Sequence, residues 1–131
     1  MQYDTFVDQV QAKAGVGSRD EAIRLAEATL ETLGERLYRT DRGDIGAQLG
    51  HELEQVLLKR AADQTTRQDV DRFGIADFYH RVSARSGIAG PDATEGARAV
   101  VSVLREALSP GAWRKVPASL PTEYRELWEE A

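Results

Sequence analysis

The second half of this chain repeats the first, and this internal repeat limits the fold more than any other feature of the sequence. A shift of 72 residues, and of 71 after a one-residue gap at Gly17, makes 13 of 57 aligned pairs identical. Ordinary compositions give about one identity in fifteen pairs by chance. The matched residues are mostly apolar or small, beginning with Phe6 and Phe78, then Val10 and Val82. The repeat therefore keeps the pattern of a core rather than a set of catalytic residues.

Apolar spacing in each unit predicts a helical hairpin. A first helix is expected over about 4–14 and 76–86, ended by Gly15 and Gly87, because glycine readily takes the left-handed conformation beyond a helix C-terminus. Ser18, three residues before a glutamate, has the spacing of a capping box. A longer second helix is expected over 19–38 and 91–108, with apolar residues every three or four positions. These residues are Ala22, Ala26, Leu30, Leu33 and Leu37, matched by Ala93, Ala97, Val101, Leu104 and Leu108.

Shorter elements complete each unit. We expect a turn or short helix around 42–48 and 110–118, and a last helix over about 51–60 and 121–130. Ser109 precedes a proline, as at a capped helix start.

No alternation typical of strands persists along the chain, and the β-prone run 99–103 lies inside the second helix of its unit. We therefore predict an all-α protein with two tandem pseudo-symmetric helical repeats packed as one compact helical bundle. The expected single unit covers 1–131, with repeat one at 3–60, a polar linker at 61–74 and repeat two at 75–131. Each half, of about 55 residues, is only marginally stable alone, so the halves are expected to pack face to face.

Composition and charge exclude several function classes. The 131 residues include no Cys, which removes disulfides and thiolate chemistry. There are 17 Lys and Arg against 22 Asp and Glu, a net charge of −5 that disfavours polyanion partners. The first residues do not resemble a signal peptide. The most apolar run, near 99–104, is far shorter than the ~20 residues of a membrane span. We expect a cytoplasmic protein with no membrane association.

The two histidines, His51 and His80, are the candidate metal ligands. Asp77 precedes His80 by three residues and shares its helix face. A symmetric site of the di-iron type would need the same spacing in repeat one. Repeat one instead has Thr5 and Asp8 at these positions. We expect no metal and no other cofactor.

Two glutamate pairs are the only charged residues identical in both repeats: Glu35 with Glu106, and Glu52 with Glu123. Paired carboxylates can perform acid–base catalysis. The structural interpretation is favoured, because the first pair points away from the apolar stripe and the second lies in a first helical turn, where it complements the helix dipole. There is also no Gly-x-Ser-x-Gly elbow and no phosphate-binding glycine loop. We therefore expect that the protein is not an enzyme.

Three aromatic residues of repeat two, Trp113, Tyr124 and Trp128, form the candidate partner surface. The favoured interpretation is core packing of the last helix. The alternative is an exposed aromatic anchor for a protein partner, a residue type that often dominates interfaces. Trp113 is the better anchor candidate, because its counterpart in repeat one, Arg42, is charged.

One basic stretch is a candidate for nucleic-acid binding. It contains Arg98, Arg105, Arg114 and Lys115. Phosphate contacts require several such residues on one face. Glu95 and Glu106 are interspersed, which favours a solvated helix surface.

The chain resembles an uncharacterised prokaryotic family, the domain of unknown function 2267. The resemblance covers nearly the whole chain, and its most specific part is the Leu-Pro-x-Glu-Tyr pattern that begins the segment 120–128. Repeat one departs from this pattern at 49–53. Further matching residues are Phe78, Val82, Gly87, 97–100 and 104–109. The resemblance implies a small bacterial or archaeal helical protein and brings no activity, cofactor or catalytic residue.

A weaker similarity links residues 6–37 to the opening helical hairpin of the HU-type nucleoid proteins. In that family the hairpin builds the dimer body and basic β-arms hold DNA. No glycine-rich strand segment or basic arm follows Leu37 here. The similarity therefore weighs against DNA binding.

The sequence is compatible with three functions. The favoured one is a non-enzymatic protein-interaction or regulatory helical module, which acts on a protein partner or by self-association. The second is a nucleic-acid or nucleoid-associated protein. The third is a small-ligand binder or enzyme with a pocket between the repeats.

Overall fold

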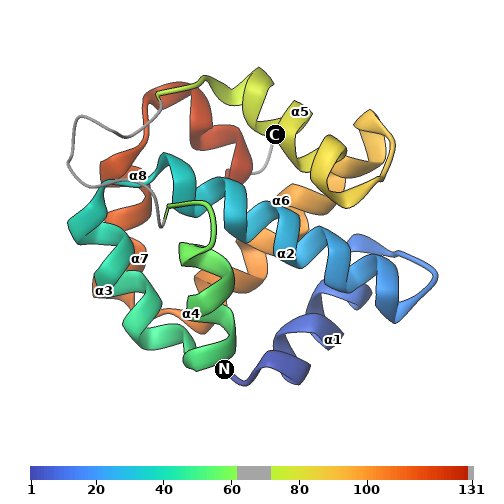
Figure 1. The fold of residues 1–131 in the computed structure, drawn as a ribbon, viewed down its shortest axis with the longest axis horizontal. Coiled ribbons are helices and arrows are strands. Elements are labelled where there is room, and N and C mark those ends of the chain that lie inside the picture. The colour runs from blue at the N-terminus through green and yellow to red at the C-terminus, as the bar shows by residue number, and fades with distance from the viewer. Residues whose placement is uncertain (62–71, 130–131) are drawn as a thin grey trace.

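Two helical hairpins form the body of the molecule (Figure 1). In the computed structural model, which describes residues 1–61 and 72–129, all regular elements are helical. The first hairpin is α1 (Tyr3–Ala14) with α2 (Arg19–Arg36), and the second is α5 (Ile75–Ser86) with α6 (Gly90–Ala107). These bounds agree with the predicted hairpins to within two residues. The β-prone run 99–103 is part of α6, as predicted.

The predicted helix caps are present. Gly15 has φ 67° and Gly87 has φ 74°, so both residues end their helices in the left-handed conformation. The Ser18 side chain accepts a hydrogen bond from the backbone N–H of Glu21 at 3.1 Å. The Ser109 side chain accepts one from a backbone N–H in the same way, at the start of α7.

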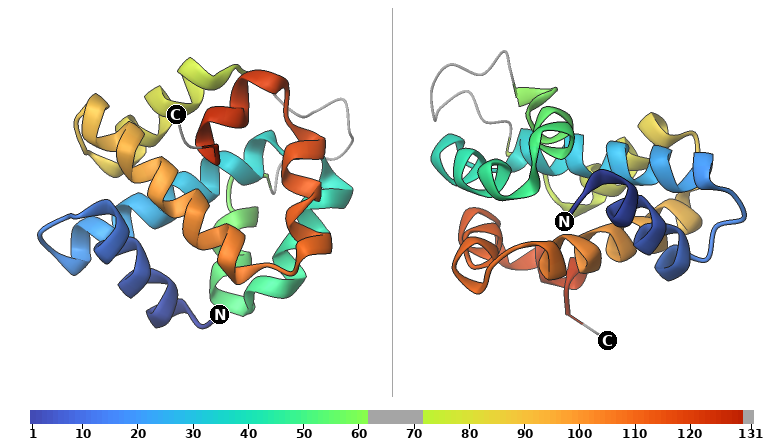
Figure 2. Two further views of the ribbon diagram at one scale, coloured as in Figure 1. Left: turned by 180° about the vertical axis from the view of Figure 1, so that it is seen from behind. Right: turned by 90° about the horizontal axis from the view of Figure 1, so that it is seen from below.

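The two hairpins interlock. Helix α1 packs against α6 of the other hairpin, α5 packs against α2, and α2 also contacts α6. Seen from below, α2 and α6 lie in different layers (Figure 2, right). Each first helix thus covers the long helix of the other hairpin, and Phe6 of α1 and its counterpart Phe78 of α5 are both fully buried.

The contact between α2 and α6 joins two positions that the repeat alignment pairs, Leu25 and Gly96. A Cβ at Gly96 would lie 2.6 Å from Cδ2 of Leu25, closer than real Cβ contacts allow. The bulky side chain of one repeat therefore occupies the space left by the missing side chain of the other.

The segments after the hairpins differ between the halves. After α2 come α3 (Arg39–Leu49) and α4 (His51–Leu58), two regular α-helices. After α6 come the short α7 (Pro110–Trp113) and α8 (Lys115–Ser119) and the 3-10 helix η3 (Thr122–Leu127). The prediction of a last α-helix over 121–130 is therefore wrong, because the described part of this segment forms a 3-10 helix that ends at Leu127.

Helix α4 lies unusually close to α2. A Cβ at Gly34 would overlap the carbonyl oxygen of Leu57 and lie 2.9 Å from its carbonyl carbon. Glycine at this position brings the two backbones together and so sets where the end of α4 lies. Within the described residues, no helix is long and apolar enough to cross a membrane. Residues 62–71 of the predicted linker lie outside the described part of the chain.

Candidate functional site

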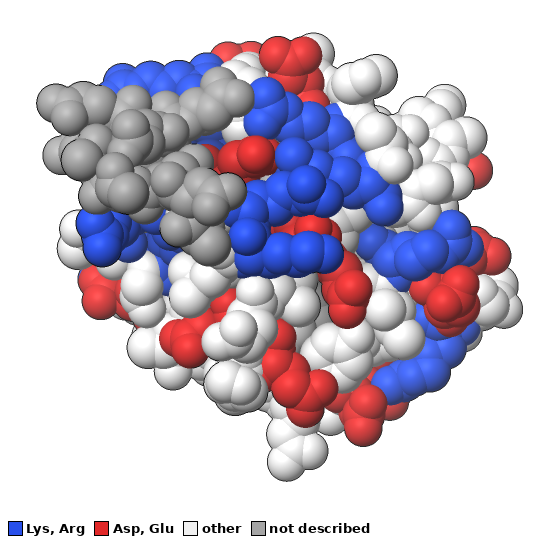
Figure 3. Space-filling model, in the orientation of Figure 1, with Lys and Arg blue, Asp and Glu red and all other residues white. Residues whose placement is uncertain are grey.

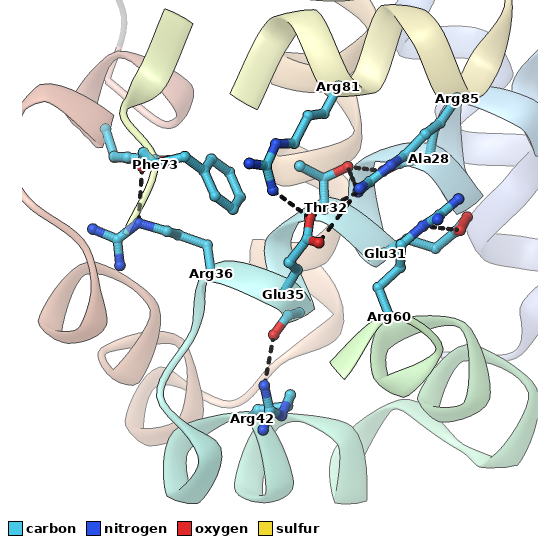
Figure 4. Close-up of polar contacts among 12 residues, drawn as sticks. Ala28, Glu31, Thr32, Glu35, Arg36, Arg42, Arg60, Phe73, Arg81 and Arg85 are labelled. Atoms are coloured by element: carbon cyan, nitrogen blue, oxygen red, sulfur yellow. Dashed lines mark hydrogen bonds and ion pairs between the residues drawn. The ribbon is translucent and has the colours of Figure 1, made fainter. Parts of the chain in front are cut away.

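The candidate site is built on the face of α2 that carries Glu31 and Glu35, one turn apart (Figure 4). Both side chains lie at the edge of the apolar face of α2, where α5 and the end of α4 cover them. The side chain of Glu31 is 7% exposed and that of Glu35 is 16% exposed. Carboxylates this buried need cationic or hydrogen-bonding partners, because an unpaired buried charge is costly.

Helix α5 supplies the partners of Glu35. Arg81 Nη1 lies 3.0 Å from Glu35 Oε1, and Arg85 Nη1 lies 2.9 Å from the same oxygen. Arg85 also donates to the Thr32 hydroxyl at 2.9 Å, which in turn donates to the Ala28 carbonyl at 2.7 Å. Figure 4 shows both guanidinium groups pointing from α5 down to α2. The ion pairs therefore join the two hairpins on their polar side.

The end of α4 supplies the partners of Glu31. Arg60 Nε donates to Glu31 Oε1 at 3.2 Å, and Lys59 Nζ lies 3.6 Å from the same oxygen. The Lys59 side chain is 65% exposed, so this cation lies at the rim of the cluster.

The backbone at Phe73 extends the network toward η3. Its carbonyl accepts from Arg36 Nε at 3.0 Å and from the Tyr124 hydroxyl at 2.7 Å. The Arg81 guanidinium stacks on the Phe73 ring, 3.7 Å from its centroid. Burial, the largest cause, raises the pKa of Tyr124 to about 12. Arg36 is thereby held against the core, since its guanidinium also lies 5.5 Å from the Tyr124 ring.

Together these residues form what we call the arginine face. It consists of the two carboxylates Glu31 and Glu35, four cations that contact them, and two further cations, of which one binds the Phe73 carbonyl and the other lies over the Tyr38 ring. The cations are Arg36, Lys59, Arg60, Arg72, Arg81 and Arg85. Figure 3 shows Lys and Arg side chains gathered over the side that carries α2 and α5, with acidic atoms between them. Among the described residues of this face the cations outnumber the carboxylates, although the whole chain has a net charge of −5.

The chemistry of the arginine face is that of anion binding. Each carboxylate accepts from at least one guanidinium, and the Thr32 hydroxyl is engaged as both donor and acceptor. Guanidinium groups donate in a planar fork that matches carboxylates. Among the described residues there is no group of three or more His, Cys, Asp or Glu residues that could hold a metal ion, and both His51 and His80 are exposed.

The matched glutamates have a structural explanation. Lys13 and Glu106 are the repeat counterparts of Arg85 and Glu35, and Lys13 Nζ lies 2.8 Å from Glu106 Oε1. Each first helix is therefore bound by an ion pair to the long helix of the other hairpin. The Lys13 pair is solvent-exposed, whereas the Arg85 pair is largely buried.

The second matched pair differs in its surroundings. Glu52 is exposed in the first turn of α4. Glu123 Oε2 accepts from the backbone N–H of Ile75 at 3.2 Å, at the start of α5. Glu123 thus stabilises the N-terminus of α5 as well as lying in the first turn of η3.

The three predicted partner-surface residues differ in their exposure. Tyr124 is fully buried and Trp113 is 7% exposed, so both rings are core residues, the favoured interpretation. The exposed-anchor alternative does not hold for them, because α7 and η3 fold back onto the core. A charged counterpart in repeat one does not indicate an exposed position, because Arg42 is itself buried and donates to the Gly34 carbonyl at 3.0 Å. Trp128 is half-buried, with its ring edge-on to Trp113 at 5.7 Å.

The four residues of the predicted basic stretch do not all lie together in the structure. Lys115 pairs with Asp44 of α3, and Arg114 donates to the carbonyl of Pro110 within its own turn. Arg98 and Arg105 lie on α6 beside the C-terminal segment. The four side chains therefore do not gather on one face, although Arg98 and Arg105 line the same hollow.

Sequence reasoning missed the arginine face because the repeat does not contain it. The repeat counterparts of Glu31 and Arg81 are Ser102 and Gln9. One signal was available: two acidic residues one turn apart on one helix, and two arginines, Arg81 and Arg85, one turn apart on another.

A hollow of about 470 Å³ lies where the start of α1 meets the corner between α3 and α4. Its lining includes Tyr3 and His51 and comes only from residues 1–4 and 48–53, so this hollow is not between the repeats. The Tyr3 hydroxyl donates to Glu27 at 3.1 Å. Burial and the nearby Glu27 raise the pKa of Tyr3 to about 12, so this hydroxyl does not provide a base at neutral pH.

The fold and the site together define an all-α bundle of interlocked hairpins with a cationic face. The family model of the uncharacterised conserved protein DUF2267 matches residues 3–127, so the chain belongs to this family. This match confirms the resemblance seen in the sequence. No curated protein matches the chain. The family carries no assigned activity, and the function of the protein is therefore unknown.

Proposed function

We propose that this protein is a cytoplasmic bacterial interaction module, without enzymatic activity, that binds an acidic segment of a partner protein on its arginine face. One observation carries this proposal: among the described residues the arginine face holds six cations and two carboxylates, and four of those cations contact the carboxylates, in a chain whose net charge is −5. A local field opposite in sign to that of the whole molecule attracts an acidic partner to one face and repels it from the others.

The arrangement of the cations supports tight docking. Arg81 and Arg85 are already ordered by Glu35, so binding costs little additional side-chain entropy. Lys59 and Arg72 are exposed at the rim and add long-range attraction.

A protein partner fits this charge pattern better than a nucleic acid. Glu31 and Glu35 lie among the cations, and a regular phosphate backbone brings its charges close to them. A polypeptide can place its carboxylates at the guanidinium groups and leave neutral residues opposite the two glutamates.

The test is a titration of the isotope-labelled protein with a short peptide rich in Glu and Asp, followed by amide chemical shifts. We expect shifts along α2, α5 and the end of α4. The double variant K59E/R72E should weaken binding about tenfold, by the loss of roughly 1.4 kcal/mol of attraction. The variant R114E, which changes an exposed arginine outside the arginine face, is the control and should bind as the unaltered protein does.

Two results would refute the proposal. One is an equal loss of affinity in K59E/R72E and R114E, which would indicate non-specific attraction. The other is a duplex DNA fragment that binds more tightly than the peptide and shifts the same residues.

A further inference from the structure

A second surface, separate from the arginine face, lies between α6 and the C-terminal segment. It contains a hollow of about 270 Å³, lined on the α6 side by Arg98, Ser102 and Arg105. These three residues are four and three positions apart and so share one helix face. Leu127, Trp128 and Glu129 of the C-terminal segment complete the lining. The hollow therefore combines two cations with an aliphatic and an aromatic surface.

The two arginines of this hollow have no acidic partner. Neither guanidinium lies within 4 Å of a carboxylate in the described part of the chain. Arg98 Nη2 donates to the backbone carbonyl of Glu129 at 3.2 Å, and the Arg105 guanidinium lies 5.2 Å from the Trp113 ring. Both groups retain donors that face no anion, unlike Arg81 and Arg85, which share Glu35.

Four acidic residues lie near the hollow in sequence or in space. Glu95 and Glu126 act on Tyr79 together with Arg98, and the other two are engaged in ion pairs. Glu106 pairs with Lys13 at 2.8 Å, and the Glu129 side chain pairs with Arg125 at 2.7 Å. Neither ion pair involves Arg98 or Arg105, so within the described residues an anion entering the hollow displaces no existing ion pair.

Trp128 gives the hollow its apolar surface. The ring is half-buried against Trp113, so it is held in place rather than free in solvent. It also lines a second hollow of about 300 Å³, together with Leu120 and Pro121. An apolar group therefore finds a rigid aromatic surface next to the two guanidinium groups.

From this combination we infer that the hollow of α6 and Trp128 binds a small organic acid, with its carboxylate on Arg98 and Arg105 and its apolar body on Leu127 and Trp128. The volume decides the size of the ligand: about 270 Å³ is slightly below the roughly 300–1,000 Å³ of pockets for drug-sized molecules. A free acid of about a dozen non-hydrogen atoms fits that limit.

The experiment uses two probes of the same shape, 4-phenylbutyrate and its neutral amide, 4-phenylbutanamide. Each is titrated into the isotope-labelled protein, and the two indole N–H resonances are followed with the backbone amides. We expect the acid to shift the Trp128 indole and the amides of Ser102 and Leu127. The neutral amide should bind at least tenfold more weakly, because it lacks the charge that the two arginines recognise.

Variants separate recognition from folding. R98Q/R105Q should lose at least tenfold in affinity for the acid, and the charge-preserving R98K/R105K should lose less. Two control variants should keep the affinity of the unaltered protein for the acid. They are R114Q, which is outside the hollow, and K59E/R72E, which is on the arginine face. Substitution of Arg105 removes its contact with Trp113 and can disturb packing. The single variant R98Q leaves that contact in place and should also weaken binding of the acid. Equal affinity for the two probes, or shifts centred elsewhere, would overturn the inference without affecting the proposed partner surface.

Discussion

Gly34 offers a direct test of the close approach between α2 and α4. Replacing Gly34 by Ala adds one methyl group inside a long helix. That methyl group would overlap the carbonyl oxygen of Leu57 and lie 2.9 Å from its carbonyl carbon, whereas ordinary contact begins near 3.4 Å. The obstacle is backbone, so no side-chain rotation relieves the overlap. Helix α4 must move away from α2.

The magnitude follows from two opposing effects. Overpacking of this kind costs about 1–3 kcal/mol. Alanine is better than glycine in a helix interior by about 1 kcal/mol, which offsets part of that cost. We expect Gly34→Ala to lower the free energy of unfolding by up to about 2 kcal/mol. The movement also carries Arg60 away from Glu31, so the ion pair at the end of α4 weakens.

The assay is urea unfolding followed by circular dichroism, with Gly43→Ala as the matched control. Gly43 is also inside a helix, α3, but a Cβ there meets no atom within 4 Å. Only the helix-propensity gain applies to it, so Gly43→Ala should stabilise the protein by up to about 1 kcal/mol. If Gly34→Ala stabilised the protein to the same extent, the close packing of α4 on α2 would be refuted.

Three further predictions concern the hairpin contacts and the buried tyrosine. Glu35→Gln should cost about 1–3 kcal/mol in urea unfolding, because two largely buried guanidinium groups lose their charge partner, whereas Glu106→Gln on the exposed counterpart should cost under about 0.5 kcal/mol. Gly96→Ala should destabilise the protein, and addition of Leu25→Ala should recover part of that loss, so additive effects in this double-mutant cycle would contradict direct contact. The protein should lose up to about 2–3 kcal/mol between pH 10 and pH 12, because the buried Tyr124 stays neutral in the fold while the same group ionises near pH 10 in the unfolded chain; alkaline unfolding of Tyr124→Phe should lack this component.

Local sequence patterns predicted the parts of this fold that depend on neighbouring residues. The 3.6-residue periodicity indicated the four hairpin helices, and Gly15, Ser18 and Gly87 marked their ends. Such patterns need only residues within about one turn of each other, and the responsible forces act over that range. The prediction failed at η3, where an apolar pattern that suits an α-helix forms a 3-10 helix.

The candidate sites depended on contacts between distant parts of the chain. Arg85 and Glu35 are 50 residues apart, and nothing local to either residue indicates that α5 lies on α2 rather than on α6 alone. The burial of Trp113 likewise follows from the path of α7, which its own neighbours in sequence did not indicate.

The sequence by itself determined that this chain is helical, that its two halves carry the same apolar pattern, and which family it belongs to. Only the tertiary structure decided that the hairpins interlock, that Leu25 fills the space at Gly96, and that six cations meet on one face. The physical reason is that helix formation is governed by interactions along a few turns. The pairing of helices is chosen by shape and charge complementarity over the whole molecule, where a missing side chain matters as much as one that is present.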